Sequence, residues 1–377
     1  MPVPQDMQPD EASAGRAISA YSSLRAEALS LSELEQLRLT LRGGSVIDWY
    51  RMNFERMDEV DAFARLNGFD VDDPGDRQAV DRLRSEAASY LSRVLGYKIP
   101  ARLTECDPRE LALYASEAMG NRRDRMFSCI LLKVMHVIHH IAARELRFVL
   151  PISDADVNQM LVQRVEACAE QMRRRGFPLL DFVGGQKRRD SVIAKLLVKR
   201  DNLAVEVYDR VRFRFVVAEP NDLVPTLRFL LQEVVPFNYV VPGQTQNDLI
   251  DFAALLHSHP SYRAHESKLQ LDVGQEEERR RAYGPRNEFS GQTYRVVNFV
   301  ADIPLVVPDD QLLLAGYREE LGRVVFAVAE FQVIDAEIAR INDSGDNAHH
   351  RYKSRQRARE RQRLERGVRG VSGRKPR

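Results

Sequence analysis

The stretch from Gly184 to Val217, GGQKRRDSVIAKLLVKRDNLAVEVYDRVRFRFVV, combines a glycine pair, a basic cluster, a short helix and a strand. Lys187, Ser191 and Lys195 are spaced four residues apart, so they share one face of the helix. Two ammonium groups and a hydroxyl in a row, directly after two glycines, suit the binding of a polyphosphate. A solvated helix face has the same pattern, and the spacing alone leaves that alternative open.

The same stretch ends in a strand that carries an acid. Residues 205–217 alternate in character and are rich in β-branched side chains, which predicts a strand. Asp209 lies inside it, and a carboxylate in an apolar strand is costly to bury unless it is paired or holds a metal ion. Cations that bind phosphate, placed beside a strand carboxylate, are the groups that magnesium–nucleotide chemistry requires.

A second apolar strand, predicted over residues 324–333, also carries an acid. Glu330 and Gln332 share one face of it, because side chains alternate along a strand. If this strand and the preceding one lie in one sheet, their two carboxylates are placed to coordinate one divalent ion. The alternative for these acids is a structural ion pair with Arg212 or Arg214.

Composition predicts a cytoplasmic protein with no contact to membranes. The 377 residues are 44% hydrophobic and 29% charged, which is enough apolar material for a real core. No apolar run reaches the ~18–20 residues of a membrane span, and the polar start has no signal-peptide core. The three cysteines, Cys106, Cys129 and Cys168, are widely spaced, which favours free thiols in a reducing compartment.

The patterning divides the chain into regions. Residues 1–19 are predicted to be disordered, and residues 20–175 form an all-helical region. Strands alternate with helices over 176–353, with a charged insertion at about 248–288, and residues 354–377 form a basic tail. This order predicts an α+β fold, in which a helical N-terminal region precedes a mixed β-sheet domain flanked by helices.

The tail carries most of the positive charge. From Arg351 to Arg377 there are twelve Lys and Arg residues and two acids, a net charge of +10, so the remainder carries about −9 to give the total of +1. Clustered Lys and Arg bind phosphates without sequence preference, which predicts contact with RNA. A solvated or frayed helix is the alternative.

The order of these motifs resembles the RelA/SpoT-type alarmone synthetases, the magnesium-dependent pyrophosphokinases of the stringent response. The family's phosphate segment has the form Lys-x3-Ser-x3-Lys, as at residues 187–195. Its metal strand has an acid followed five residues later by arginine, as in Asp209 and Arg214. Its second metal strand and the segment after it are matched by Glu330, Gln332, Asp343, Gly345, Ala348, His349, Tyr352 and Lys353. The resemblance covers roughly residues 180–353 and implies a nucleotidyltransferase-like sheet.

The resemblance also implies roles for single residues. Asp209 and Glu330 would hold Mg²⁺ and act as the catalytic acids, with ATP donating pyrophosphate to the 3′-hydroxyl of GDP, GTP or a related nucleotide. Tyr294 would stack on the acceptor base. The residues expected to bind nucleotide are Lys187, Arg188, Ser191, Lys195, Arg214, Tyr294, Gln332 and His349.

Three departures from the family pattern leave the acceptor open. Gly185 replaces an arginine on the adenine side, Asn298 replaces a histidine on the guanine side, and Ile334 replaces an arginine. Two alternatives therefore stand beside a guanosine alarmone synthetase. One is a toxin-like enzyme that modifies the 3′ end of tRNA, and the other is a catalytically inactive nucleotide-binding sensor. The sequence is compatible with an oligomer in each case.

A histidine-rich segment, MHVIHHIAARE, lies in the helical region. His136 and His140 are four residues apart and share a helix face, as two ligands of a metal ion would. A pair without a third ligand is a weak pattern, and packing inside the protein is the preferred interpretation.

Overall fold

Five strands form one mixed sheet in the computed structural model, which describes residues 21–43, 52–186, 189–198, 211–269, 293–314, 319–344 and 349–365. The strand order is β1-β2-β5-β4-β3. Their bounds are β1 (Leu179–Gln186), β2 (Val211–Val217), β3 (Gln246–Asn247), β4 (Val297–Val306) and β5 (Val324–Asp335). β2 and β5 are parallel and the other neighbours are antiparallel, so the predicted α+β fold with a mixed sheet is confirmed.

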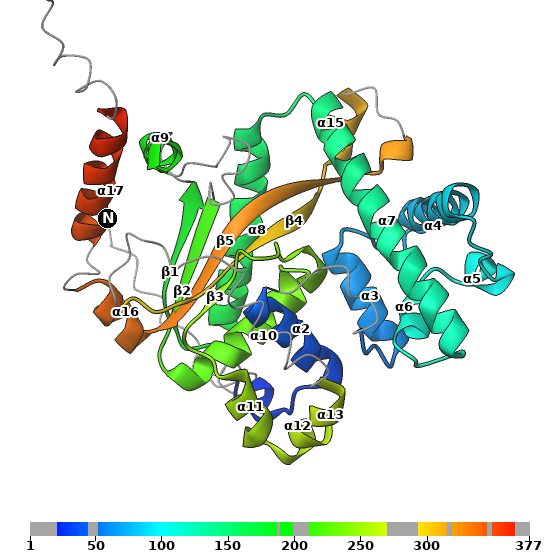
Figure 1. Ribbon diagram of the computed structural model, residues 1–377, viewed down its shortest axis with the longest axis horizontal. Coiled ribbons are helices and arrows are strands. Elements are labelled where there is room, and N and C mark those ends of the chain that lie inside the picture. The colour runs from blue at the N-terminus through cyan, green and yellow to red at the C-terminus, as the bar shows by residue number, and fades with distance from the viewer. Residues whose placement is uncertain are drawn as a thin grey trace, which may run out of the picture.

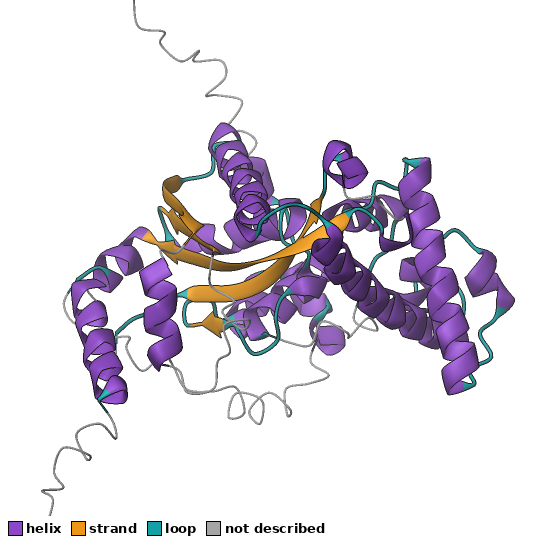
Figure 2. Cartoon of the chain, turned by 90° about the horizontal axis from the view of Figure 1, so that it is seen from above, coloured by secondary structure: helices purple, strands orange, loops and turns teal. Residues whose placement is uncertain are grey.

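Helices lie on both sides of the sheet and extend beyond one end of it (Figures 1 and 2). Those before the first strand are α2 (Leu31–Arg42), α3 (Met57–Leu66), α4 (Pro74–Leu95), α5 (Ala101–Glu105), α6 (Glu110–Ala115), α7 (Arg122–Val149) and α8 (Asp154–Arg174). The later ones are α9 (Arg189–Val198), α10 (Leu223–Glu233), α11 (Phe252–Ser258), α12 (Pro260–Ala264), α13 (Glu266–Leu269), α15 (Asp309–Leu314), α16 (Ala336–Asn342) and α17 (His349–Leu364).

One face of the sheet is the main core. Phe213, Phe299 and Phe331 are fully buried there, with the ring of Phe331 5.5 Å from that of Phe213 and 5.3 Å from that of Phe299. Helices α2, α8 and α10 contribute side chains to the same hydrophobic cluster. Because strand side chains alternate, the residues directly before and after each of these phenylalanines on its strand point to the opposite face, which we call the outer face.

A second hydrophobic cluster lies among α3, α4, α6 and α7, with Leu91, Leu111 and Leu131 at its centre. Phe237 packs against both clusters. The second cluster forms the group of helices to the right of the sheet in Figure 1. The domain boundaries predicted from the sequence stay predictions.

Helix α7 has a length and composition that would allow it to cross a membrane, alone among the helices of the described ranges. In this protein its Phe127, Leu131 and Met135 pack into the second cluster. Core helices of soluble proteins meet the same criteria of length and composition. Location in the cytoplasm therefore stays a prediction.

Two elements differ from the sequence expectation. The β-branched pattern predicts a strand at residues 237–241, but this segment is a 3₁₀ turn, η4 (Phe237–Tyr239), followed by a single bridge from Val240 to Ala301. Pro236 lacks an N–H group to donate to a ladder, which disfavours a regular strand there. Strand β1 is the second difference, because no alternation in the segment predicts it.

Candidate functional site

A row of polar side chains crosses the outer face of the three central strands. In the strand register Arg212 lies opposite Glu330, Arg214 lies opposite Gln332, and Asn298 also lies opposite Gln332. We call these five residues the polar row. They alternate with the core phenylalanines, so the chain's own period-two pattern brings them to one face.

Glu330 is the one acid of these five residues and is held by two hydrogen-bond donors. Its Oε2 accepts a hydrogen bond from Nε of Arg212 at 2.7 Å, and its Oε1 accepts one from Nε2 of Gln332 at 3.2 Å. The Glu330 side chain is 10% exposed and that of Arg212 is 41% exposed. The ion pair that the sequence left open as an alternative is therefore present at Glu330.

Arg214 is oriented by a second acid. Its two terminal nitrogens lie 3.4 Å and 3.2 Å from Oδ1 and Oδ2 of Asp343, which follows α16 and is exposed. The guanidinium is thus held from the side by a solvated carboxylate. Guanidinium groups are suited to phosphate because their fork of N–H donors matches its oxygens.

An apolar patch continues the same face beyond the polar row. Val216, Val296 and Ile334 are buried together, and Tyr294 is half-buried against them. The run from Tyr294 to Val300 predicts a strand that Tyr294 opens, but β4 begins at Val297 and Tyr294 precedes it. The charged row thus lies beside a small buried cluster, against which Leu249 and the α16 residues Ile338 and Ala339 also pack. Tyr294 is the partly exposed aromatic side chain of this half of the face.

The glycine pair borders the polar row. Gly185 lies opposite Arg212, and a Cβ added at Gly185 would meet no atom of the described residues within 4 Å. A ligand can therefore approach the backbone there. β1 ends at Gln186 and α9 begins at Arg189, so the start of α9 is tied to this end of the row. Helix α9 packs against α17 (Figure 1).

The predicted site residues fall into three groups. Arg214, Glu330 and Gln332 come together in the polar row, with Tyr294 in the adjoining patch. Helix α9 carries Ser191 and Lys195 and helix α17 begins at His349, but the structure does not describe these three side chains. Residues outside the described ranges are Lys187, Arg188 and Asp209.

The surroundings of Glu330 do not fit a divalent cation. Mg²⁺ takes oxygen ligands, whereas Glu330 accepts hydrogen bonds from the N–H groups of Arg212 and Gln332, the first of which is cationic. Across the described ranges, no three His, Cys, Asp or Glu residues are grouped to hold a metal ion. The predicted partner acid, Asp209, lies outside those ranges. Arg212 is the residue that the sequence analysis did not assign to the site, although it named Arg212 as an ion-pair partner.

The histidine-rich segment of α7 is packed inside the protein. Nδ1 of His139 lies 3.0 Å from the hydroxyl of Tyr239, and the ring of His136 stacks on that tyrosine at 4.5 Å. Nε2 of His140 lies 3.6 Å from Oδ2 of Asp302. Burial lowers the pKa of His136 to about 4 and that of His139 to about 3. Burial raises the pKa of Asp302 to about 6.

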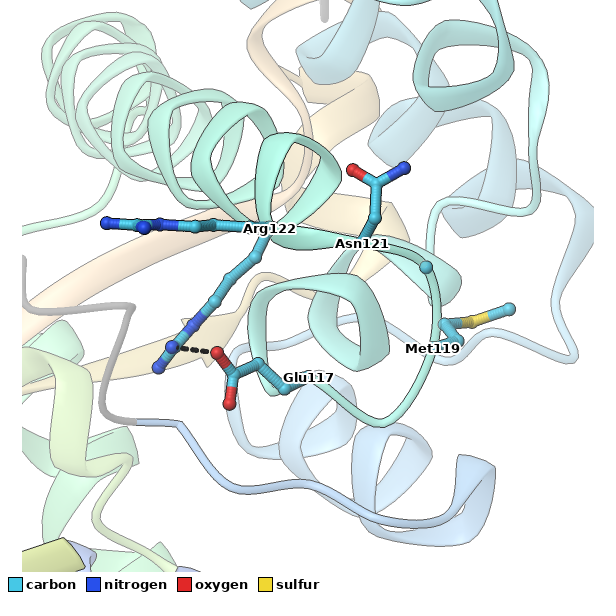
Figure 3. A pocket seen from close by; sticks show the side chains of 6 residues that line it. Glu117, Met119, Asn121 and Arg122 are labelled. Carbon is cyan, nitrogen blue, oxygen red and sulfur yellow. Dashed lines mark hydrogen bonds and ion pairs between the residues drawn. The ribbon is translucent and has the colours of Figure 1, made fainter.

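A separate hollow lies at the turn between α6 and α7 (Figure 3). It is lined by Glu117, Met119, Gly120, Asn121, Arg122 and Arg125. Arg125 forms an ion pair with Glu117 across it. Arg122 and His139 are 17 positions apart on α7, or roughly 25 Å at 1.5 Å per residue. The hollow therefore lies at the end of α7 away from the contact of His139 with Phe326 of β5.

No protein-family model matches the sequence, and no curated protein matches it. Solved structures similar to it are alarmone synthetases or GTP pyrophosphokinases. Small alarmone synthetase 2 from Bacillus subtilis is 11% identical, over 58% of this chain and 96% of that chain, with a TM-score of 0.30. A GTP pyrophosphokinase family protein from Streptococcus pneumoniae is 13% identical, over 57% and 88%, with a TM-score of 0.29.

Small alarmone synthetase 1 from Bacillus subtilis, bound to its product pppGpp, is 15% identical over 61% of this chain and 98% of that chain, with a TM-score of 0.30. These proteins are of the kind that the sequence resembles. Because these TM-scores are low, the functional argument rests on the residues of the outer face and not on these similarities.

Proposed function

We propose that the outer face of the sheet binds nucleoside polyphosphates and transfers pyrophosphate from ATP to the 3′-hydroxyl of a guanine nucleotide. One observation carries the proposal: a charged row and the partly exposed ring of Tyr294 adjoin on one face, next to the start of α9. Arg212 and Arg214 would contact phosphate oxygens, and Tyr294 would stack on the acceptor base. Lys187, Arg188, Ser191, Lys195 and His349 remain predicted nucleotide contacts.

The transfer needs positioning and charge neutralisation more than covalent help from the protein. The 3′-oxygen of the acceptor attacks the β-phosphorus of ATP, and the bond from that phosphorus to the α–β bridging oxygen breaks. AMP leaves with the bridging oxygen. The proton of the attacking hydroxyl passes to the carboxylate of Glu330, which its hydrogen bonds to Arg212 and Gln332 hold in a fixed orientation.

Magnesium stays part of the proposal as the ion that accompanies ATP, since polyphosphates bind Mg²⁺ through their own oxygens. No step is assigned to it at Glu330. Asp209 stays the predicted ligand from the protein. The sequence resemblance supports both statements.

An RNA acceptor is the second candidate, and α17 favours it. This helix contains Arg351, Lys353, Arg355, Arg357, Arg359, Arg361 and Arg363 against the single acid Glu360. It packs against α9, so a polyanion bound to α17 would lie near the polar row. The tRNA 3′ end offers the same attacking hydroxyl as a mononucleotide.

The proposal is tested by incubating the purified protein with γ-labelled ATP, Mg²⁺ and either GDP, GTP or tRNA. Label in a guanine nucleotide supports the first candidate, and label in RNA supports the second. Label in neither would leave a nucleotide sensor. Glu330→Gln should slow transfer at least ~100-fold, because it removes the carboxylate that accepts the proton.

The matched control is Glu320→Gln, an exposed acid in the 3₁₀ turn η5 (Glu319–Leu321) that precedes β5. This variant should transfer at the wild-type rate. Far-ultraviolet circular dichroism should show both variants folded. Transfer by Glu330→Gln at the wild-type rate would remove Glu330 from the mechanism.

A further inference from the structure

Arg212 occupies the position at Glu330 that a metal ion would need. We propose that its guanidinium is the permanent counter-cation of Glu330, so that this face binds nucleotide phosphates without a divalent ion at that carboxylate. The statement about phosphates rests on the proposed function. The statement about the counter-cation rests on the strands alone.

The pair is built into the sheet. Arg212 and Glu330 are direct neighbours in the parallel register of β2 and β5, and the hydrogen bond between Nε and Oε2 is 2.7 Å long. Gln332, two positions along β5, donates to the other carboxylate oxygen. All three side chains start from central strands whose backbone positions are fixed by the ladder. The arrangement therefore does not depend on a loop.

Burial explains why Glu330 keeps a cation beside it. A carboxylate that is 10% exposed needs a hydrogen-bonded countercharge, because an unpaired buried charge is strongly destabilising. A divalent ion bound to the same carboxylate oxygens would lie next to the guanidinium of Arg212, and the two positive charges would repel each other. Either Arg212 or a metal ion can be the countercharge of Glu330, and the strand register places Arg212 there.

The same arginine also faces the ligand side. Its side chain is 41% exposed, and the backbone of Gly185 opposite it is open to approach. The hydrogen bond to Oε2 of Glu330 is made through Nε. A guanidinium held in this way gives a phosphate the fixed positive charge that a bound metal ion supplies in metal-dependent sites.

The first experiment needs no nucleotide. Mn²⁺ serves as a probe for divalent binding, and its free concentration is followed by electron paramagnetic resonance. Wild type and Glu330→Gln should bind Mn²⁺ alike. Arg212→Gln should gain a Mn²⁺ site that is at least ~10-fold tighter, and Arg212→Gln/Glu330→Gln should lose it again. Wild-type binding that is lost in Glu330→Gln would overturn the proposal, and that comparison needs no variant of Arg212.

The second experiment measures ATP binding by calorimetry in Mg²⁺ and in EDTA. The change from Mg²⁺ to EDTA should alter the ATP affinity of wild type and of Glu330→Gln by the same factor within ~3-fold, while Arg212→Gln should bind ATP at least ~10-fold more weakly than wild type in EDTA. Arg174→Gln, an exposed arginine at the end of α8, is the matched control and should behave as wild type. A loss of affinity in EDTA that is more than ~10-fold larger in wild type than in Glu330→Gln would place the divalent ion at Glu330 and contradict the proposal.

The two experiments separate the counter-cation from the proposed function. Absence of ATP binding in both buffers would overturn the proposed function and the statement about phosphates. The Mn²⁺ comparison would still decide whether Arg212 excludes a metal ion from Glu330.

Discussion

At the scale of single residues, the pairing of Arg212 with Glu330 changes what the acid can do. For a divalent ion ~5 Å from a guanidinium, Coulomb's law with an effective dielectric constant of ~20 gives a repulsion on the order of 6 kcal/mol before screening. That repulsion opposes the binding of a divalent ion at Glu330 while Arg212 is paired with it. Glu330 is therefore an oriented, charge-neutralised acceptor of hydrogen bonds.

Gly184 and Gly185 have different physical roles, although they adjoin in the sequence. A Cβ at Gly184 would lie 2.7 Å from Cδ1 of the fully buried Phe213. Gly184→Ala should therefore overpack the core and lower the free energy of unfolding by about 1–3 kcal/mol, measured by urea denaturation. The sequence of the glycine pair predicts phosphate binding, but the contact with Phe213 is by itself a sufficient reason for glycine at position 184.

A double-mutant cycle tests that cause. Phe213→Leu removes the ring atoms that the new methyl group would meet, so Gly184→Ala should cost less in the Phe213→Leu background than in wild type. Equal costs in both backgrounds would assign the effect to the backbone of β1 and not to the ring.

At the scale of elements, local signals predict what local interactions build. The pattern Ser153-x-x-Asp156 predicts a helix start, and the two residues form the capping box that begins α8. The apolar alternation from Val324 predicts β5, which extends to Asp335. Edge strand β1 carries two glycines and has no such alternation, so only its pairing with β2 defines it.

The contact between Arg212 and Glu330 shows where prediction from sequence stops. The two residues are 118 positions apart, and the sequence offers both an ion pair and a metal site as explanations for Glu330. Strand order and register place Arg212 beside Glu330, and both are properties of the assembled sheet. Asp209, Lys187 and Arg188 lie outside the described ranges, so their roles stay predictions.

Helix α17 gives a prediction about RNA. Arg357 and Arg361 are one helical turn apart and both are exposed. Each phosphate contact adds about 0.7 to the slope of log K against log salt for a single strand, so Arg357→Gln/Arg361→Gln should lower that slope by about 1.4. Filter binding of tRNA at several salt concentrations measures it.

The control for α17 is a matched pair of exposed arginines on α8. Arg173→Gln/Arg174→Gln removes the same charge from the whole protein. If both double variants changed the slope equally, net charge would explain RNA binding, and α17 would have no special part in it.

At the scale of the whole molecule, buried histidines connect the helical cluster to the sheet. Helix α7 places His139 8% exposed between the hydroxyl of Tyr239 and the ring of Phe326 on β5. Its Nε2 has no hydrogen-bond partner among the described residues. A charge in this position would be unpaired, so the junction between α7 and β5 depends on neutral imidazole.

This dependence predicts how stability responds to acid. Burial lowers the pKa of His139 from its ordinary 6.5 to about 3, so the unfolded chain binds this proton first as pH falls. The stability from neutral His139 is complete above pH 6.5 and is lost as pH falls from 6.5 towards 3. Asp302 acts in the opposite sense, because burial raises its pKa from 3.8 to about 6 and the folded protein binds this proton first. Its contribution to the free energy of unfolding therefore grows as pH falls from 6 towards 3.8.

His139→Gln isolates one histidine from these opposing effects. Glutamine stays neutral and can still bond to Tyr239, so the variant should lose about 1.4 kcal/mol less per pH unit than wild type between pH 6 and 4. Urea denaturation at each pH measures the difference. His257→Gln, an exposed histidine on α11, should follow the wild-type curve. If His139→Gln also followed it, the imidazole would be charged inside the folded protein, and the contact of α7 with β5 would have to contain a countercharge for it.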